Sequence, residues 1–420
     1  MTPKKKLKIV FIHPDLGIGG AERLVLDVAA AFKKQNHEVL FVTNHYNQTH
    51  AFEELKNGEF PVEVYGDWLP RTIYGRFQAL CAYLRMIYLI VFYLVFGKNS
   101  QSPDLYFVDL IPVAVPFLKF ANKRVIYYCH HPDLLASPPG GCLKRFYRKP
   151  IDWLEFKATS FADIILVNSV YTASIFRETF PQIKKPIQIL YPTIAYSYLE
   201  SVQKRKHFKP IQKIVPEIVC NNKDLNIFLS VNRFHPAKRL EFAIEAMEIL
   251  KSMTSASEWE KTYCIIAGGY DPINKTNADT FTKLSDMIRE KNLRDKIFLL
   301  KSPSESIKVD LLHSCTALLY TPLKEHFGIV PLETMLVAKP VIAMNSGGPR
   351  ETVDHGVTGY LCECSSESMA EFMYRIIKED SKDMGVKGRE RLEEKFSYKS
   401  FAKSLEQVLK DVTDFSKKTD

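Results

Sequence analysis

The sequence predicts an α/β protein built from two doubly wound domains, each with a parallel sheet covered by helices on both faces. Short, continuously apolar runs alternate with segments whose apolar residues recur at helical spacing, and this alternation occurs in both halves of the chain. The length of 420 residues exceeds what one ordinary core fills, so two domains of about 200 residues each are expected. A polar, basic stretch with two prolines lies between the two series and predicts a linker.

The expected strands follow one another along each half. Each is a short apolar run bounded by turn residues or by a helical pattern such as 21–35. In the first half they are 6–13, 38–44, 105–112, 124–129, 162–169 and 187–192. In the second half they are 226–234, 263–269, 296–300, 315–322, 340–345 and 359–363.

These elements divide the chain into a first domain at 1–198, a linker at 199–224, a second domain at 225–396 and a terminal segment at 397–420. The terminal segment is expected to form a helix followed by a charged tail, and packing against the first domain is one placement for it. Because ligands of doubly wound folds bind at the carboxyl ends of the strands, we expect the two domains to face each other across a cleft.

Charge and cysteine content narrow the classes of function. A net charge of +9 calls for an anionic partner, and charge alone leaves nucleic acid, a membrane face and a phosphorylated substrate open. The eight cysteines include no CxxC pair and several lie within strand runs, which indicates reduced, buried thiols and a reducing compartment. The basic start of the chain leads into only a short apolar run, so it predicts a first strand and not a signal peptide.

Two glutamates bracket a strand-to-helix turn in the second half. Glu325 precedes the turn, and Glu333 lies in the helical pattern that follows it. Backbone N–H groups at a helix start offer unpaired donors and a positive dipole end to a phosphate. Glu333 is placed to accept hydrogen bonds from a ribose diol, and Glu325 to meet sugar hydroxyls or developing positive charge, so the turn predicts nucleotide-sugar chemistry. The residues whose backbone would contact the donor are Phe327, Gly328, Ile329 and Val330.

Three other strand ends carry candidate donor contacts. The first strand runs into a turn whose Gly19 and Gly20 allow a close backbone approach, with a tight structural turn as the main alternative. Arg233 and Lys238 follow the first strand of the second half and suit a diphosphate, against the alternative of a solvated helix start. Gly268 ends the next strand, where loop packing and ligand contact are both open. The GxGxxG fingerprint is absent, which disfavours a dinucleotide oxidoreductase.

One segment raises the question of a membrane. Residues 79–97 are strongly apolar, but the uninterrupted part, 86–96, is about 16 Å long as a helix, whereas a bilayer core is about 30 Å thick. An interfacial or re-entrant helix with Arg85 reaching to the surface is favoured over a buried core helix or a full span. A nearby segment interleaves aromatic and basic residues and suits an anionic lipid surface, against the alternative of a solvated basic helix. Its basic residues are Lys144, Arg145, Arg148 and Lys149.

Several of these motifs occur together in one known family. GGAER, NRF followed by Lys238, AGG, EHFGIVPLE and SGGPRE stand in that order over nearly the whole chain. The sequence therefore resembles the family 4 glycosyltransferases, whose fold is GT-B, with two Rossmann-like domains facing across a cleft. GDWLPR, CHHPDLL, PIDWLE, LLHSC and KEHFGIVPLE narrow the resemblance to the eukaryotic mannosyltransferases that add an α1,3- and then an α1,6-mannose to dolichol-linked Man-GlcNAc2. The match departs at His131, where an aromatic residue is expected, and it carries the family's histidine onto His130.

The resemblance implies a retaining mannosyltransferase that uses GDP-mannose as donor and Man-GlcNAc2-diphospho-dolichol as acceptor, in N-glycan precursor synthesis, without a metal or other cofactor. It implies His130 and Glu325 as the catalytic residues, with Glu325 orienting the sugar in a front-face reaction and a covalent mechanism as the other option. It gives the acceptor and the membrane to domain 1–198 and the donor to domain 225–396. The sequence contains no Asp-x-Asp pair, which agrees with transfer that needs no metal.

The implied setting is the cytosolic face of the endoplasmic reticulum membrane, where assembly with other early-pathway mannosyltransferases is an option. Nucleic acid is not an expected partner, because it would explain the charge but not the paired carboxylates. Two alternatives remain open: another nucleotide-sugar-dependent lipid glycosyltransferase, and an inactive membrane-associated scaffold that keeps donor binding.

Overall fold

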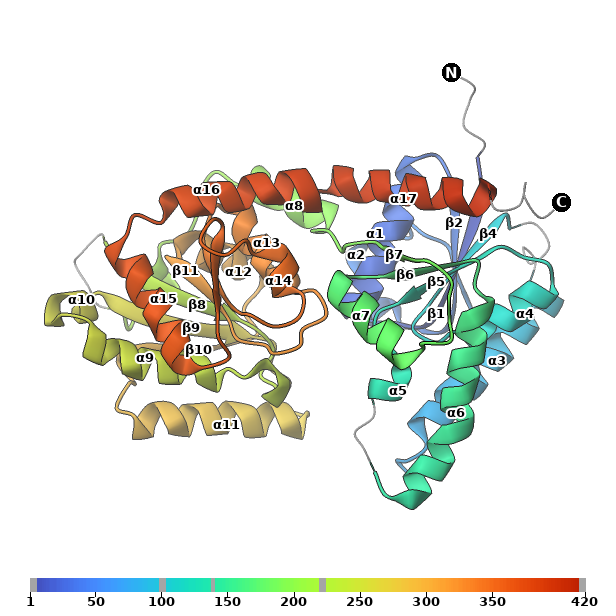
Figure 1. Cartoon of the computed structure of the whole chain (residues 1–420), viewed down its shortest axis with the longest axis horizontal. Coiled ribbons are helices and arrows are strands. Elements are labelled where there is room, and N and C mark those ends of the chain that lie inside the picture. Colours follow the sequence, from blue (N-terminus) through green and yellow to red (C-terminus); the bar gives the residue numbers. More distant parts are fainter. Residues whose placement is uncertain (1–5, 98–102, 137–139, 219–223, 415–420) are drawn as a thin grey trace. The chain divides into compact units, whose positions relative to one another are not determined.

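The chain forms two compact units, and the computed structural model describes residues 6–97, 103–136, 140–218 and 224–414 (Figure 1). The first unit extends to Ala195 and includes the terminal helix from Tyr398, whereas the second runs from Tyr196 to Ser397. The segment 199–224, expected as a linker, therefore lies in the second unit wherever the structure describes it.

The first unit is built on a seven-stranded parallel sheet with the order β3-β2-β1-β4-β5-β6-β7. Successive residues of its interior strand β1 alternate between two cores, with Ile9 and Phe11 on one face and Val10 and Ile12 on the other. Both faces are therefore buried, as the continuously apolar strand sequences predict. The strands are β1 Lys8–Leu16, β2 Glu38–Tyr46, β3 Val62–Val64, β4 Leu105–Asp109, β5 Val125–Cys129, β6 Ile164–Val167 and β7 Ile187–Ile189.

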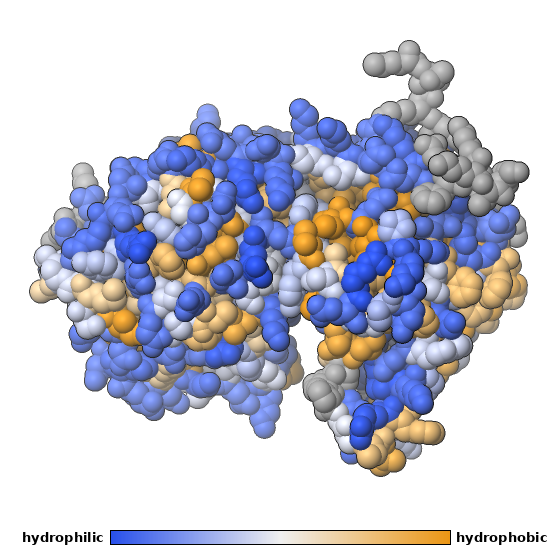
Figure 2. All heavy atoms as spheres, in the orientation of Figure 1, coloured by the Kyte–Doolittle hydropathy of each residue, from blue (hydrophilic) through white to orange (hydrophobic). Residues whose placement is uncertain are grey.

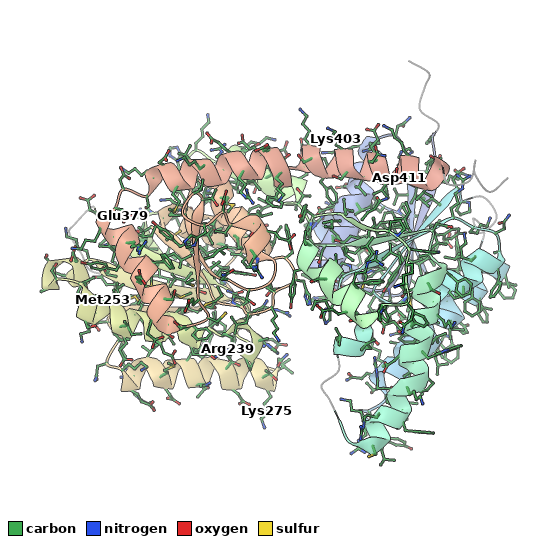
Figure 3. The ribbon with its side chains drawn as sticks, viewed as in Figure 1. Arg239, Met253, Lys275, Glu379, Lys403 and Asp411 are labelled. Atoms are coloured by element: carbon green, nitrogen blue, oxygen red, sulfur yellow. The ribbon has the colours of Figure 1, made fainter. Side chains whose placement is uncertain are left out.

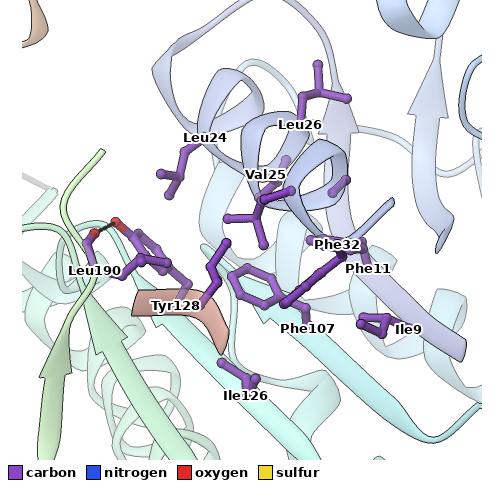
Figure 4. Packing of buried hydrophobic residues seen from close by; sticks show 14 of the residues in the cluster. Ile9, Phe11, Leu24, Val25, Leu26, Phe32, Phe107, Ile126, Tyr128 and Leu190 are labelled. Carbon is purple, nitrogen blue, oxygen red and sulfur yellow. Dashed lines mark hydrogen bonds between the residues drawn. The ribbon is translucent and has the colours of Figure 1, made fainter. Parts of the chain in front are cut away.

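Helices cover both faces of this sheet. On one face Val25 and Phe32 of α1 pack against Phe11 and Phe107 (Figure 4), and Leu405 of α17 joins the same core. On the other face α3, α4, α6 and α7 contribute apolar side chains to the second core. The helices of this unit are α1 Gly20–Lys34, η1 Gln48–His50, α2 Glu53–Lys56, α3 Gln78–Phe96, α4 Ala114–Phe120, α5 Asp133–Ala136, α6 Cys142–Phe161, α7 Val170–Thr179 and α17 Tyr398–Asp414.

The terminal helix α17 is also joined to the first unit by hydrogen bonds. Gln188 on β7 donates its side-chain N–H to the carboxylate of Asp411 at 2.8 Å, and Asp411 is labelled on this helix in Figure 3. Gln35, which follows α1, donates to the carbonyl oxygen of Ala402 at 3.2 Å. A segment from the far end of the sequence thus completes the first unit.

The second unit holds a six-stranded parallel sheet with the order β10-β9-β8-β11-β12-β13. α9, α11 and α15 share one core with this sheet, and α12 and α13 contact β8, β11 and β12. The strands are β8 Asn226–Val231, β9 Thr262–Gly268, β10 Ile297–Lys301, β11 Ala317–Tyr320, β12 Val341–Met344 and β13 Gly359–Cys362. The helices are α8 Tyr196–Gln203, η2 Ile211–Lys213, η3 Pro236–Lys238, α9 Glu241–Met253, α10 Ala256–Glu260, α11 Lys275–Glu290, α12 Glu305–Ser314, α13 Ile329–Leu336, α14 Pro349–Thr352, α15 Ser366–Lys378, α16 Lys382–Arg391 and a π-helical turn at Leu392–Phe396.

The basic segment after α8 is anchored to α12. Arg205 forms an ion pair of 2.6 Å with Asp310, a carboxylate that is fully buried and also accepts the backbone N–H of Lys209 at 3.0 Å. Phe208 stacks on His313 with 3.7 Å between ring centroids. These contacts give the segment a fixed course on the second unit.

The apolar helix α3 has one face in the protein core. It is long and apolar enough to cross a membrane by length and composition, yet Met86, Leu89 and Tyr93 pack in the core of the first unit. Val95 and Phe96 lie on its exposed side. α3 therefore has the burial of a core helix on one side and leaves apolar surface on the other.

The expectation that Arg85 reaches a membrane surface is wrong. Its side chain is only 6% exposed, and its guanidinium lies 3.4 Å from the carboxylate of Asp15 and 3.9 Å from that of Asp67. A buried guanidinium needs carboxylates or hydrogen-bond acceptors near it, and these two acids supply them within the first unit. Arg85 is thus a structural cation.

Candidate active site

The predicted acidic turn lies between β11 and α13. Gly328, the residue before the helix, has φ = 86°, and a side chain there would also meet the Tyr320 hydroxyl at 3.0 Å. Glycine is the residue that tolerates this conformation, so the turn depends on it. The backbone N–H groups at the start of α13 are thereby placed at the carboxyl edge of the sheet, where the sequence predicts the donor.

Lys238 and Glu325 form an ion pair across this edge. Lys238 is the last residue of the short η3 turn after β8. The hydroxyl of Thr321 donates a hydrogen bond of 2.6 Å to the carbonyl oxygen of Lys238, and this bond joins the loops that follow β8 and β11. Both charged side chains remain partly accessible. The structure thus brings together two residues that the sequence predicts for the diphosphate and the sugar.

Arg233, the second predicted cation, is exposed at the end of β8. Its side chain runs over Gly269, where an added side-chain carbon would lie 3.3 Å from its Cγ atom. In the described part of the chain it forms no ion pair, so its charge is available to an anion. Its contact with the donor stays a prediction.

Glu333 is buried in α13, and its two oxygens have different surroundings. Oε1 is 2.8 Å from the ammonium group of Lys308 on α12, and that ammonium group lies over the ring of Tyr198 at 4.7 Å. Oε2 is buried and has no hydrogen-bond partner among the described residues. One oxygen of Glu333 therefore lacks a protein partner among the described residues, and its contact with a ribose stays a prediction. Sequence reasoning missed Lys308, because no motif surrounds it.

Two glycines of the SGGPRE motif hold the acidic turn in place. The N–H of Gly348 donates to the carbonyl oxygen of Glu325 at 2.7 Å. A side chain on Gly347 would come within 2.2 Å of that same oxygen, and one on Gly348 within 2.2 Å of the Phe327 carbonyl oxygen. The motif is explained by this close backbone contact, which sets the course of the turn.

Gly268 also has a packing reason. A side-chain carbon there would lie 1.6 Å from the carbonyl oxygen of Asn232, because the ends of β8 and β9 approach closely. Of the two options that the sequence left open, close backbone packing accounts for glycine at this position. A donor contact at Gly268 stays a prediction.

The glycine-rich turn of the first unit borders a polar pocket. A side-chain carbon added to Gly19 would lie 2.4 Å from the carboxylate of Glu22. A side-chain carbon added to Gly20 would have no atom within 4 Å. The adjacent pocket has a volume of about 320 Å³. Its lining residues are Asp15, Leu16, Gly17, Glu22, His45, Asn47, His50 and Arg71. Gly20 thus leaves room for a ligand, while the carboxylate of Glu22 occupies the helix start.

His130 follows β5 and belongs to a cluster that the sequence reading did not detect. Its Nε2 lies 3.2 Å from Oδ2 of Asp109, and Nδ1 of His13 lies 2.8 Å from Oδ1 of the same carboxylate. His13 and Asp109 are buried, and His130 is partly accessible. The sequence does contain a signal for His13 and Asp109, the two missed residues. Each is a polar residue near the carboxyl end of an apolar strand, and the two lie next to each other because Ile12 pairs with Val108 in the sheet.

The charges in this cluster are fixed by proximity. Burial alone would lower the pKa of His13, but the Asp109 carboxylate, with Glu22 nearby, raises it well above its ordinary value, to about 10. Burial alone would raise the pKa of Asp109, but His13 and His130 bring it below its ordinary value. His13 is therefore a cation at neutral pH and Asp109 an anion.

The predicted membrane-facing cations differ in burial. Lys144, Arg145 and Lys149 lie on the N-terminal part of α6 with partly or fully exposed side chains. The prediction for Arg148 is wrong: its guanidinium is buried and lies 3.0 Å from Asp133 and 2.8 Å from Asp152. It points inward because one side of the amphipathic helix faces α5.

No described group of three or more His, Cys, Asp and Glu side chains is arranged to hold a metal ion. The acidic turn has cationic side chains near it. Arg233 and Lys238 both follow β8 at the carboxyl edge of the second sheet.

Comparison with known proteins places this geometry in a family. The model of Glycosyltransferase Family 4 matches residues 18–197, and that of Glycosyl transferases group 1 matches residues 213–395. The α-1,3/1,6-mannosyltransferase ALG2 of Homo sapiens is 41% identical over 407 residues, which cover 95% of each chain. The relative of the same name in Mus musculus is 40% identical over 408 residues, covering 96% of this chain and 95% of that one. The chain belongs to the ALG2 family of glycosyltransferases.

The fold of this ALG2-family chain also has solved counterparts. A sucrose-phosphate synthase from Thermosynechococcus elongatus superimposes with a TM-score of 0.75 at 17% identity, covering 97% of this chain and 100% of that one. At this identity the likeness shows the fold alone. The predictions of two parallel Rossmann-like sheets, the GT-B class and a family 4 mannosyltransferase are confirmed.

Proposed function

We propose that the chain transfers mannose from GDP-mannose to dolichol-diphosphate-linked Man-GlcNAc2, first in α1,3 and then in α1,6 linkage. The observation that carries the proposal is the Lys238–Glu325 pair at the ends of β8 and β11, found in a chain that is 41% identical to a relative named as an α-1,3/1,6-mannosyltransferase. The pair combines a cation for a leaving phosphate with a carboxylate for the sugar.

The donor is bound by the second unit in this proposal. Lys238 and Arg233 contact the diphosphate, together with the N–H groups at the start of α13. When the diphosphate binds, Lys238 gains a second anionic partner beside Glu325, and negative charge growing on the leaving group strengthens that contact. The free oxygen of Glu333 accepts a ribose hydroxyl. A donor aimed at the leaving phosphate contributes about 3 kcal/mol to transition-state stabilisation, or about a hundredfold in rate.

Glu325 orients the mannose and offsets positive charge at the anomeric carbon. Its salt bridge limits the rotation of the carboxylate, because the ammonium group of Lys238 holds one oxygen. His130 acts from the first unit on a hydroxyl of the sugar substrates. Retention then follows from departure of the diphosphate and arrival of the acceptor on the same face of the sugar.

The acceptor's lipid brings the first unit to a membrane at the cytosolic face of the endoplasmic reticulum. Leu143 and Phe146, on α6, are 88% and 83% exposed and stand among Lys144, Arg145 and Lys149. Figure 2 shows apolar and charged side chains next to each other at this end of the helix. Apolar side chains that insert and cations worth about 1 kcal/mol each at an anionic surface support membrane docking there.

Transfer is tested with purified full-length protein, a Man-GlcNAc2-diphosphate lipid, and either GDP-mannose or UDP-glucose. We expect two sequential mannose additions from GDP-mannose that persist with chelator present. Lys238→Ala is expected to reduce kcat by about a hundredfold. The matched control is Lys291→Ala, which removes a similar ion pair with Glu248 on the surface of the same unit. Transfer from UDP-glucose alone, or equal losses in both variants, contradicts the proposal.

Membrane docking is tested separately by flotation with vesicles of phosphatidylcholine and phosphatidylserine. Leu143→Ser combined with Phe146→Ser is expected to lower the bound fraction at least tenfold, because two large apolar groups no longer insert. The matched control is Ile273→Ser, a 93% exposed apolar residue of the second unit. Binding that is unchanged by the α6 substitutions places the membrane contact elsewhere.

A further inference from the structure

The cluster of His13, Asp109 and His130 comes from three neighbouring strands. β1, β4 and β5 are adjacent in the sheet, and Asp109, the last residue of β4, pairs in register with Tyr128 of β5. All three side chains therefore meet at the carboxyl edge of the first sheet. The backbone of His130 is fixed as well, because the side chain of Asn168 donates to its carbonyl oxygen at 3.3 Å.

Asp109 is held between the two histidines by both of its oxygens. Oδ1 accepts from Nδ1 of His13 at 2.8 Å and Oδ2 lies 3.2 Å from Nε2 of His130. The other ring nitrogen of His13, Nε2, is 3.9 Å from the Glu22 carboxylate. A buried carboxylate is stable only when it is paired. His13 provides that pairing and keeps the Asp109 side chain in one orientation.

An ionised carboxylate can only accept hydrogen bonds, so the nitrogen of His130 that faces Asp109 must carry the hydrogen. In the neutral ring, Nδ1 then holds the lone pair. Within the described part of the chain Nδ1 of His130 has no hydrogen-bond partner, and the ring is partly accessible. In that neutral tautomer the available nitrogen is thus an acceptor.

We infer that Asp109, held by His13, is a positioning residue that fixes His130 in the Nε2–H tautomer and presents its Nδ1 lone pair to a hydroxyl of the sugar substrates. The inference rests on the proposed function, in which His130 contacts substrate, and adds which atom makes that contact and what orients it. Neither His13 nor Asp109 touches substrate in this assignment.

The tautomer is measured first, in the wild-type protein without substrate. Long-range 15N–1H NMR of histidine-labelled protein, with the His130 signals assigned by their loss in His130→Gln and the pH set so that the ring is neutral, should show a hydrogen on Nε2 and a bare Nδ1. Hydrogen on Nδ1 overturns the inference. This readout does not depend on activity, so it stands even if the proposed transfer reaction fails.

The second measurement is a double-mutant cycle in the mannose-transfer assay. His130→Ala is expected to lower kcat about a hundredfold and Asp109→Asn about tenfold or more, with KM for the donor little changed. If Asp109 acts through His130, adding Asp109→Asn to His130→Ala changes kcat by less than about twofold. A full further loss in the double variant overturns the inference.

A matched control separates positioning from general destabilisation. Asp27→Asn removes another buried, ion-paired carboxylate of the first unit, which lies 2.9 Å from Arg23 on α1. We expect it to keep wild-type kcat and the wild-type His130 tautomer. If the wild-type protein transfers no mannose, only the proposed function is contradicted. If the wild type transfers mannose and His130→Ala keeps full activity, the role of His130 is contradicted.

Discussion

Asp109 and Glu333 are both buried carboxylates beside a cation, and they differ at the second oxygen. The second oxygen of Asp109 faces His130, whereas Oε2 of Glu333 has no partner among the described residues. A buried acceptor without a partner is unfavourable by about 1–3 kcal/mol, so a ligand hydroxyl that reaches it binds more tightly. The local contacts thus suit Asp109 to orienting a neighbour and Glu333 to binding a ligand.

The role of Glu333 is tested by Glu333→Gln, which keeps the shape of the side chain and removes its charge. We expect KM for GDP-mannose to rise about tenfold, equivalent to about 1.4 kcal/mol, because the ribose loses a charged acceptor. kcat should stay within about threefold, since the ribose is remote from the bond that breaks. Initial-rate kinetics measure both, with Glu371→Gln, an exposed carboxylate paired with Arg375 on α15, as control. An unchanged KM would remove Glu333 from the donor site.

The raised pKa of His13 predicts how stability depends on pH. In the unfolded chain the imidazole loses its proton near its ordinary pKa of about 6.5, while in the folded chain it keeps the proton up to about pH 10. Its contribution is therefore complete below about pH 6.5 and declines as pH rises towards the folded value. Calorimetry of wild type and His13→Gln at pH 6 and pH 8.5 should show a difference in Tm that narrows at the higher pH. A gap that widens at pH 8.5 contradicts the ion pair.

The functional residues that were predicted from the sequence stand in recognisable motifs, whereas those that were missed do not. For Glu325, Lys238 and His130, residue type and spacing within a motif predict a functional role. Lys308 contacts Glu333, and Asp109 contacts His130, through tertiary packing within their own units, and neither residue stands in one of the recognised motifs. Polar residues at the ends of two apolar strands were the one available signal for His13 and Asp109.

At the scale of elements, α6 positions the loop that follows β5. The carboxylate of Glu155 accepts the backbone N–H groups of Asp133 at 2.6 Å and Leu134 at 3.0 Å. Arg148 joins Asp133 to Asp152. The sequence motifs CHHPDLL and PIDWLE therefore contact each other in the fold. Sequence reading recognised each motif, but only the packing of α6 on α5 shows why they occur together.

Removing this contact should loosen the loop that carries His130. Glu155→Ala leaves two backbone donors without their acceptor, and we expect a loss of about 1–2 kcal/mol in unfolding free energy, as for other helix-start contacts. Hydrogen exchange should quicken in residues 130–136, and kcat should fall. The control is Ser255→Ala, which removes the capping box of α10 in the second unit. Unaltered exchange at 130–136 would show that α6 does not hold the loop.

At the scale of the whole molecule, the two sheets were predictable because parallel strands buried on both faces are apolar along their length. The course of the segment that follows α8 was not predictable. The segment after α8 is polar and contains prolines, yet Arg205 and Phe208 fix part of it on α12. Such contacts depend on Asp310 and His313, about 100 residues further along, and local composition does not show them.

The return of α17 to the first unit predicts that a mutation near the end of the chain weakens a sheet near its start. Leu405 is fully buried in the core that contains Phe11 and Val25, so Leu405→Ala should destabilise the first unit by about 2–5 kcal/mol. Hydrogen exchange should accelerate in β1 and α1 and stay unchanged in β8 and α9, because those elements have a separate core. Val386→Ala, at an exposed site on α16, serves as the control. Equal acceleration in both units would mean that they unfold together, and acceleration confined to the second unit would contradict the placement of α17.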